Sequence, residues 1–136
     1  YAHRLWTGVE HELVSPESRC TRLHGHNAVV ELELTSESTG VGGMVRDFTD
    51  LERTFGAWIR EHWDHRVFLH ESDPLVSVLR GIPGGVESDV WTMRTNPTCE
   101  LFAESLYGVA RRFELPVSAV RFRETPGNQA EYRSDS

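Results

Sequence analysis

The strongest constraint on the fold is a short run in which two histidines precede an alternating strand. His24 and His26 are followed at every second position by aliphatic residues (Ala28, Val30, Leu32 and Leu34). Side chains two residues apart on a strand share a face. We therefore expect a strand over 26–35, with both imidazoles beginning the face that becomes a buried core. Such a face indicates a polar site at the edge of that core.

The remaining patterns predict two amphipathic helices and a C-terminal hairpin. The first helix is expected from Phe48 to about residue 62 with Asp47 as its cap, and the second follows Asn96-Pro97-Thr98 and ends before Pro116. A short helical turn is expected over 74–79, an extended piece over 90–93, and a hairpin turn at 126–128. The element order ββααββ predicts one α+β domain, 1–136, whose antiparallel sheet is covered on one face by two helices.

Composition excludes several classes of protein. The net charge is −7 with no basic patch, which argues against a nucleic-acid partner. The chain has no apolar run long enough to span a bilayer and no signal-peptide pattern. Its two cysteines do not form a disulfide framework, so we expect the reducing cytoplasm. All 14 basic residues are arginines, which reflects either genomic base composition or a phosphate-bearing substrate that arginine forks would bind.

Two histidines on one strand face are the start of a metal site, and a third ligand is available upstream. His3 lies in an apolar-flanked segment that can pair antiparallel with the 26–35 strand, whereas His11 lies among acidic residues in an expected surface loop. Three histidines with an open fourth position are typical of catalytic zinc. The competing interpretation is a set of hydrogen-bonded sheet histidines. Cys20 is either a fourth ligand, closing a structural zinc site, or a nearby thiolate favoured by Arg19 and Arg22.

Several acidic residues are further candidates. Asp64-His65 follows the first helix, and the two side chains can pair only if the chain turns there. Such a pair serves proton transfer, although a surface pair is the more common explanation. Glu124 shares a strand face with Val120 and Phe122, so its carboxylate is expected to point inward, toward a heterocyclic ligand or an arginine. Glu100 has a simpler explanation as a charge near a helix N-terminus, and His62 and His70 are expected to be structural or exposed.

Six ordered motifs together resemble one family. They are Ala2-His3-Arg4-Leu5, Cys20-x-x-x-His24-Gly-His26-Asn27, Met44-Val45-x-Asp47-Phe48-x-x-Leu51, Asp64-His65, Asn96-Pro97-Thr98-x-Glu100 and Glu124-Thr125-Pro126. The chain is similar to the 6-pyruvoyltetrahydropterin synthase / 6-carboxytetrahydropterin synthase (QueD) family. The resemblance implies a tunnelling fold of four antiparallel strands and two helices. It also implies assembly through trimers, commonly a hexamer of two trimers with active sites at subunit interfaces.

The resemblance also implies roles for individual residues. Zn²⁺ would be held by His3, His24 and His26, Cys20 would be the general base, and Asp64 with His65 of another subunit would transfer protons. Glu124 would bind the pterin ring, with Thr98 and Glu100 as further substrate-binding positions, and Arg22 is the first candidate for the triphosphate.

The implied substrate is 7,8-dihydroneopterin triphosphate. The three-residue gap between Cys20 and His24 resembles the carboxytetrahydropterin type, which releases acetaldehyde and triphosphate and feeds 7-deazapurine or queuosine-type synthesis. The alternatives are a pyruvoyl synthase and a non-catalytic zinc- or pterin-binding protein. The segment 71–95 is longer than in the typical bacterial enzyme, which leaves substrate preference open.

Overall fold

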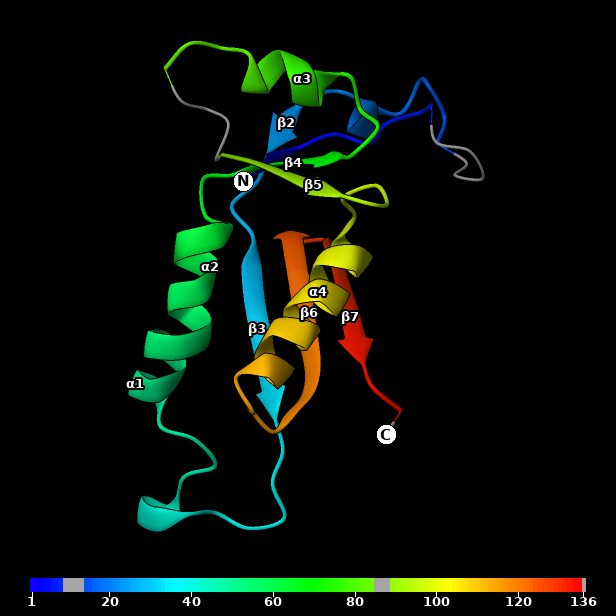
Figure 1. Ribbon diagram of the computed structural model, residues 1–136. Helices are drawn as coiled ribbons and strands as arrows, with labels where there is room; N and C mark the ends of the chain where they lie inside the picture. Colours follow the sequence, from blue (N-terminus) through cyan, green and yellow to red (C-terminus); the bar gives the residue numbers. More distant parts are fainter. Residues whose placement is uncertain (9–13, 85–88, 136) are drawn as a thin grey trace.

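A computed structural model describes residues 1–8, 14–84 and 89–135, and it contains two sheets (Figure 1). The larger sheet is antiparallel, with the order β3 (Val29–Leu34), β6 (Val117–Thr125) and β7 (Asn128–Arg133). The smaller sheet has the order β2 (His24–Gly25), β1 (Ala2–His3), β4 (Val67–His70) and β5 (Val90–Met93). Within it β1 pairs antiparallel with β2, while β4 pairs parallel with both β1 and β5.

The α+β class and the six expected strands and helices are present, but the strand pairing differs from the expected single four-stranded antiparallel sheet. The run from His24 to Leu34 is interrupted between β2 and β3, where the His26 amide donates to the Tyr1 carbonyl. As a result β1 pairs with β2 and not with the long strand. β4 was not predicted, because its four residues pair in parallel with a strand far away in the sequence.

The first helix follows the expected boundaries. It consists of α1 (Phe48–Leu51), a π-helical stretch over Glu52–Gly56 and α2 (Ala57–His62). The Asp47 carboxylate accepts a hydrogen bond from the Thr49 amide at 2.8 Å, which confirms the predicted cap. Phe55 is buried in the core, whereas Phe48 at the start of the stripe is 83% exposed.

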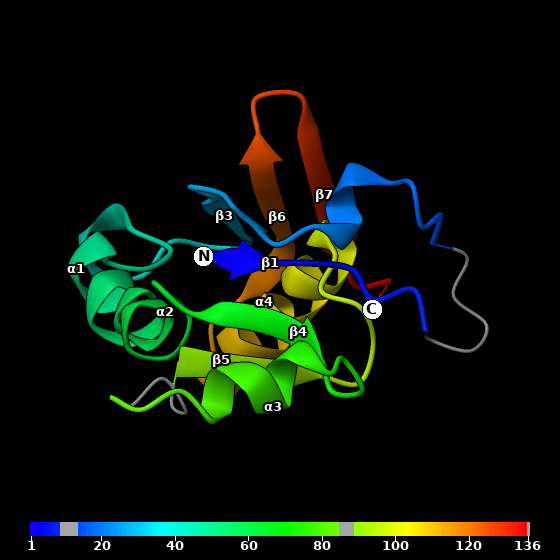
Figure 2. The same ribbon diagram turned by 90° about the horizontal axis from the view of Figure 1, so that it is seen from above.

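The second helix, α4 (Cys99–Arg112), packs along β6 and β7. Its cap is Thr98, whose hydroxyl accepts from the Leu101 amide at 3.4 Å. Apolar residues of α4 and β6 are buried against one another and form most of the main core. Phe55, Trp63 and Phe68 complete this core. Its residues from α4 and β6 include Phe102, Ala103, Leu106, Ala110, Val120 and Phe122. Seen from above, α2 and α4 lie on the same side of the β3-β6-β7 sheet (Figure 2).

The segment 71–95 contributes α3 (Leu75–Arg80) and the edge strand β5 to the smaller sheet. It is tied to β1 by Asp73, whose buried carboxylate receives two hydrogen bonds from Arg4 at 2.5 and 2.7 Å. Among the described residues, no helix has both the length and the apolar character needed to cross a membrane.

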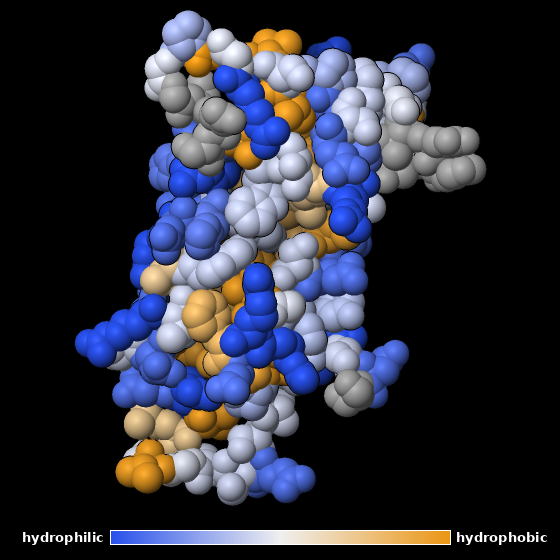
Figure 3. Space-filling view, viewed as in Figure 1, coloured by the Kyte–Doolittle hydropathy of each residue, from blue (hydrophilic) through white to orange (hydrophobic). Residues whose placement is uncertain are grey.

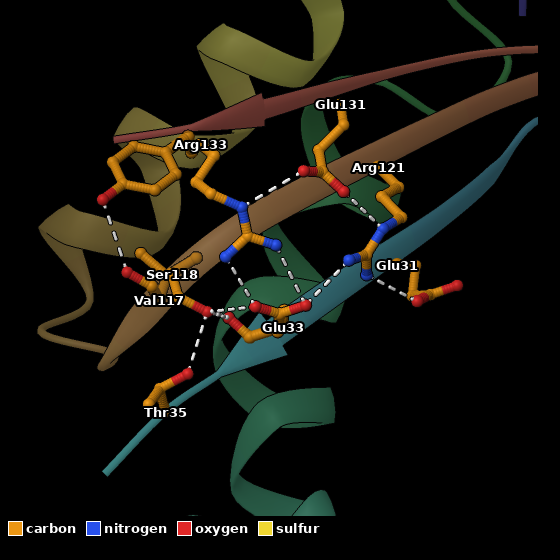
Figure 4. A network of polar contacts seen from close by, with 9 residues as sticks. Glu31, Glu33, Thr35, Val117, Ser118, Arg121, Glu131 and Arg133 are labelled. Atoms are coloured by element: carbon orange, nitrogen blue, oxygen red, sulfur yellow. Dashed lines mark hydrogen bonds and ion pairs between the residues drawn. The ribbon is translucent and has the colours of Figure 1, made fainter. Parts of the chain in front are cut away.

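The outward face of the larger sheet carries a network of ion pairs across all three strands (Figure 4). Glu33 on β3 pairs with Arg121 on β6 and Arg133 on β7, and both arginines also pair with Glu131. Hydrogen bonds from Arg133 and Arg121 lower the pKa of Glu33 to about 2. Exposed pairs of this kind stabilise little individually, but cross-strand pairs favour one register. On the opposite side of the molecule, the face seen in Figure 3 exposes apolar residues at separate places among polar ones.

Candidate metal centre and active site

Three histidines meet where β1 and β2 pair. The register places His3 opposite His24, and His26 follows one residue after β2 ends. The ring centroids lie 4.6 Å apart for His3 and His24, 5.4 Å for His3 and His26, and 4.9 Å for His24 and His26. One nitrogen from each ring lies within 4.8 Å of the other two. His3 therefore lies beside His24 and His26, as expected of a third ligand, and its role as a ligand stays a prediction; the alternative, His11, lies outside the described residues.

The hydrogen bonds of two imidazoles fix which nitrogen faces the centre. His3 Nδ1 lies 2.8 Å from the Pro97 carbonyl oxygen, and His24 Nδ1 lies 2.5 Å from the Arg22 carbonyl oxygen. A carbonyl only accepts, so each Nδ1 carries the hydrogen and each Nε2 keeps its lone pair. In metal sites, a carbonyl that accepts from the other ring nitrogen commonly holds the histidine in this way. Within the described part of the chain, the buried Nε2 of His3 has no hydrogen-bond partner.

Burial is the main cause that lowers the pKa of His3, and the neighbouring imidazoles of His24 and His26 lower it further. A neutral imidazole is the form that binds metals. The three histidine nitrogens lie close together, and the buried Nε2 of His3 has its lone pair free for a ligand bond. This arrangement fits a divalent metal ion that prefers nitrogen ligands. The residues present can therefore hold such an ion.

Glu124 points inward beside this centre, as its position on the strand predicts. Its side chain is 16% exposed, with Oε1 lying 3.5 Å from His3 Nε2 and Oε2 lying 3.9 Å from His26 Nε2. Its hydrogen-bond partner is the Tyr1 hydroxyl, which donates to Oε1 at 2.5 Å. The alternative prediction of an arginine partner is not met by any contact within the described residues.

A cavity of about 370 Å³ opens in front of His3 and Glu124. It is also lined by Cys20, Thr98 and Glu100, which the sequence had singled out, and by Cys99, which it had not. Cys20 is exposed and lies in the 3₁₀ turn Arg19–Thr21 that precedes β2. The Cys20 thiol, the carboxylates of Glu100 and Glu124 and the His3 imidazole thus line one cavity.

Asp64 and His65 lie on a different opening, a cavity of about 310 Å³ that they share with Tyr1 and His26. The chain does turn after α2 as required, because His65 adopts φ 63° and its Nδ1 lies 3.0 Å from Asp64 Oδ1. His65 is 89% exposed. Neither residue lines the cavity of Cys20, so one copy of the chain does not bring the thiol and this pair together.

Other predicted positions have simpler outcomes. Arg22 is exposed and has extended backbone between the 3₁₀ turn and β2, and its role toward the triphosphate stays a prediction. His70 is buried and its Nδ1 accepts from the Ser72 amide at 2.9 Å, which is the expected structural role. Sequence reasoning missed Tyr1, although it is two residues from His3 and so shares its strand face.

Comparisons with known proteins agree with this arrangement. The family model for 6-pyruvoyl tetrahydropterin synthase matches residues 1–135. A curated 6-carboxy-5,6,7,8-tetrahydropterin synthase from Rickettsia bellii is 30% identical over 74% of this chain and 71% of its own length. The enzyme of the same name from Aquifex aeolicus is 25% identical, with 98% of this chain and 91% of the relative covered.

Solved structures show the fold. An uncharacterized protein from Wolinella succinogenes superposes with a TM-score of 0.77 at 27% identity, covering 99% of this chain and 93% of that one. The 6-pyruvoyl tetrahydropterin synthase of Caenorhabditis elegans superposes with a TM-score of 0.68 at 23% identity, covering 98% and 88%. The tunnelling fold expected from the sequence is thereby confirmed.

Proposed function

This chain belongs to the 6-pyruvoyl tetrahydropterin synthase family, and we propose that it is a zinc-dependent 6-carboxytetrahydropterin synthase. Membership makes it a pterin synthase, a lyase. The proposed reaction converts 7,8-dihydroneopterin triphosphate and water into 6-carboxytetrahydropterin, acetaldehyde and triphosphate. Curated relatives from Rickettsia and Aquifex with the carboxy-type name favour this product, as does the short spacing from Cys20 to His24.

The observation that carries the proposal is the open three-histidine centre beside Glu124 and the cavity of Cys20. Zn²⁺ held by His3, His24 and His26 would supply Lewis acidity toward the hydroxyls of the substrate side chain. Cys20 would remove a side-chain proton as general base. Glu124 would accept hydrogen bonds from the amino group and ring N–H of the pterin, with Thr98 and Glu100 completing the wall.

The proton-transferring pair would come from a neighbouring copy, because Asp64 and His65 lie away from Cys20 within one chain. We therefore propose a homo-oligomer with active sites between subunits, as a hexamer of two trimers. Arg22 is exposed and remains the proposed contact for the triphosphate, because two N–H groups of the planar guanidinium can bind two phosphate oxygens at once. The product would feed 7-deazapurine synthesis of the queuosine type.

Product analysis tests the reaction. The zinc-loaded protein is incubated with 7,8-dihydroneopterin triphosphate, and the pterin and any acetaldehyde are identified by mass spectrometry. The proposal predicts 6-carboxytetrahydropterin and one acetaldehyde per turnover. A pyruvoyl product without acetaldehyde would assign the protein to the other activity of its family, and binding without turnover would indicate a non-catalytic scaffold. Cys20→Ala should lose activity by about a hundredfold or more while still binding zinc.

A subunit-mixing experiment tests the shared site. Cys20→Ala and His65→Ala proteins, each inactive alone, are unfolded together and refolded as mixed oligomers. If each site combines Cys20 of one copy with His65 of the next, random mixing restores about one quarter of the parent activity. If both residues act within one chain, mixing restores none. Refolding each variant alone is the control.

A further inference from the structure

Tyr1 lies between the three-histidine centre and the aromatic core. Its ring centroid is 5.0 Å from that of His3 and 5.8 Å from that of His26. On its other sides it contacts the core rings of Phe102 at 5.1 Å and Phe68 at 5.7 Å, both edge to face. A ring held from both sides in this way has little freedom to move. Its hydroxyl therefore has a fixed position.

That hydroxyl holds the Glu124 carboxylate, which lines the same cavity as Cys99 at the start of α4. Tyr1 donates to Glu124 Oε1 at 2.5 Å, and a charged acceptor makes such a bond stronger than a neutral one. The Tyr1 hydroxyl is therefore a donor that holds one oxygen of Glu124 in place.

The carboxylate has a second possible direction, toward the metal centre. Its oxygens lie 3.5 Å from His3 Nε2 and 3.9 Å from His26 Nε2, and carboxylate oxygens are common zinc ligands. If Glu124 turned to bind the ion, it would close the open position and would no longer face a ligand ring. Each carboxylate oxygen accepts about two hydrogen bonds, so holding Glu124 through Tyr1 leaves acceptor sites free for two donors of a heterocycle.

We propose that Tyr1 is a positioning residue that keeps the Glu124 carboxylate directed at the substrate ring and away from the metal. This inference rests on the proposed function, in which Glu124 binds the pterin. Tyr1 itself touches neither the reacting atoms nor the ion. By holding Glu124, Tyr1 keeps the fourth coordination position of the metal open and keeps the Glu124 carboxylate available to the pterin ring.

The test is Tyr1→Phe, which removes the hydroxyl and keeps the ring packing. Tyr107→Phe is the matched control, because Tyr107 is also buried and its hydroxyl bonds the Val117 carbonyl at 3.3 Å, within the α4–β6 core. The probe is pterin itself, which has the ring donors but no side chain. Its affinity for the zinc-loaded protein is measured by fluorescence, and zinc affinity is measured separately with a competing chelator.

The proposal predicts opposite changes in Tyr1→Phe: pterin binds about tenfold more weakly, while zinc binds at least as tightly as in the parent. Tyr107→Phe should leave both affinities unchanged. Two results would overturn the inference: pterin binding by Tyr1→Phe equal to that of the parent, or a parallel loss of pterin and zinc binding, which marks a merely structural role. A parent protein that does not bind pterin at all would instead refute the proposed function, and the inference with it.

Discussion

The buried pair between Arg4 and Asp73 is expected to be the strongest single polar contribution to the stability of the smaller sheet. Arg4 Nε and Nη2 donate to the two Asp73 oxygens at 2.7 and 2.5 Å, and the Leu75 amide donates to Asp73 Oδ1 at 2.8 Å. The Asp73 side chain is 0% exposed and that of Arg4 is 23% exposed. Asp73→Ala would leave the guanidinium without its anion and the Leu75 amide, at the start of α3, without its side-chain acceptor.

The size of the effect follows from this burial. Removing one partner of a buried ion pair costs roughly 3–5 kcal/mol. Because water reaches part of the Arg4 side chain, we expect the lower end, about 3 kcal/mol of unfolding free energy for Asp73→Ala. Asp89→Ala is the matched control, since Asp89 pairs with Arg66 at 2.9 Å but both side chains are partly exposed, at 38% and 26%. Its cost should be about 1 kcal/mol or less.

The assay is urea unfolding of both variants and the parent, without metal and at one protein concentration, because oligomer stability depends on concentration. Arg4 directly follows His3, so Asp73→Ala should also weaken zinc binding while Asp89→Ala should not. A loss below about 1 kcal/mol for Asp73→Ala, equal to that of the control, would refute the reasoning from burial.

Three further predictions concern the metal centre, the ion-pair network and the thiols. His24→Ala should lower zinc affinity by more than about a hundredfold in a chelator competition, whereas His62→Ala should leave it unchanged. The ion pairs lower the pKa of Glu33 from 4.5 to about 2, so Glu33 contributes to the free energy of unfolding above pH 4.5, and this contribution is lost as the pH falls toward 2. In Glu33→Gln, the free energy of unfolding should therefore fall less over this pH range than in the parent. Iodoacetamide at about pH 8 should modify exposed Cys20 and spare Cys99, whose thiol pKa is raised to about 12, as read by peptide mass spectrometry.

Local patterns in the sequence predict most of the fold. The helical stripe from Phe48 and the cap at Asp47 fix the first helix, and the period-two run fixes β3. The smaller sheet could not be predicted in the same way. β4 has only four residues, and its partners β1 and β5 are set by long-range contacts that leave no periodic signal.

The candidate site divides along similar lines. Side chains two residues apart on a strand share a face, and this rule predicts that His24 and His26 lie together and that Glu124 points inward. Both expectations match the structure. The partner of Glu124 was not predicted, since a tyrosine in an apolar segment looks like a core residue until its hydroxyl is placed. The joint action of Cys20 with Asp64 and His65 rests on family resemblance and not on contacts within one chain.

X-ray absorption at the zinc edge tests the central claim most directly, because it distinguishes an open catalytic centre from a closed structural one. For the zinc-loaded protein we predict only nitrogen and oxygen neighbours at about 2.0–2.1 Å, from His3, His24, His26 and solvent. Cys20→Ala should leave this spectrum unchanged. A sulfur neighbour at about 2.3 Å that disappears in Cys20→Ala would contradict the account, because Cys20 would then be a zinc ligand and not a base.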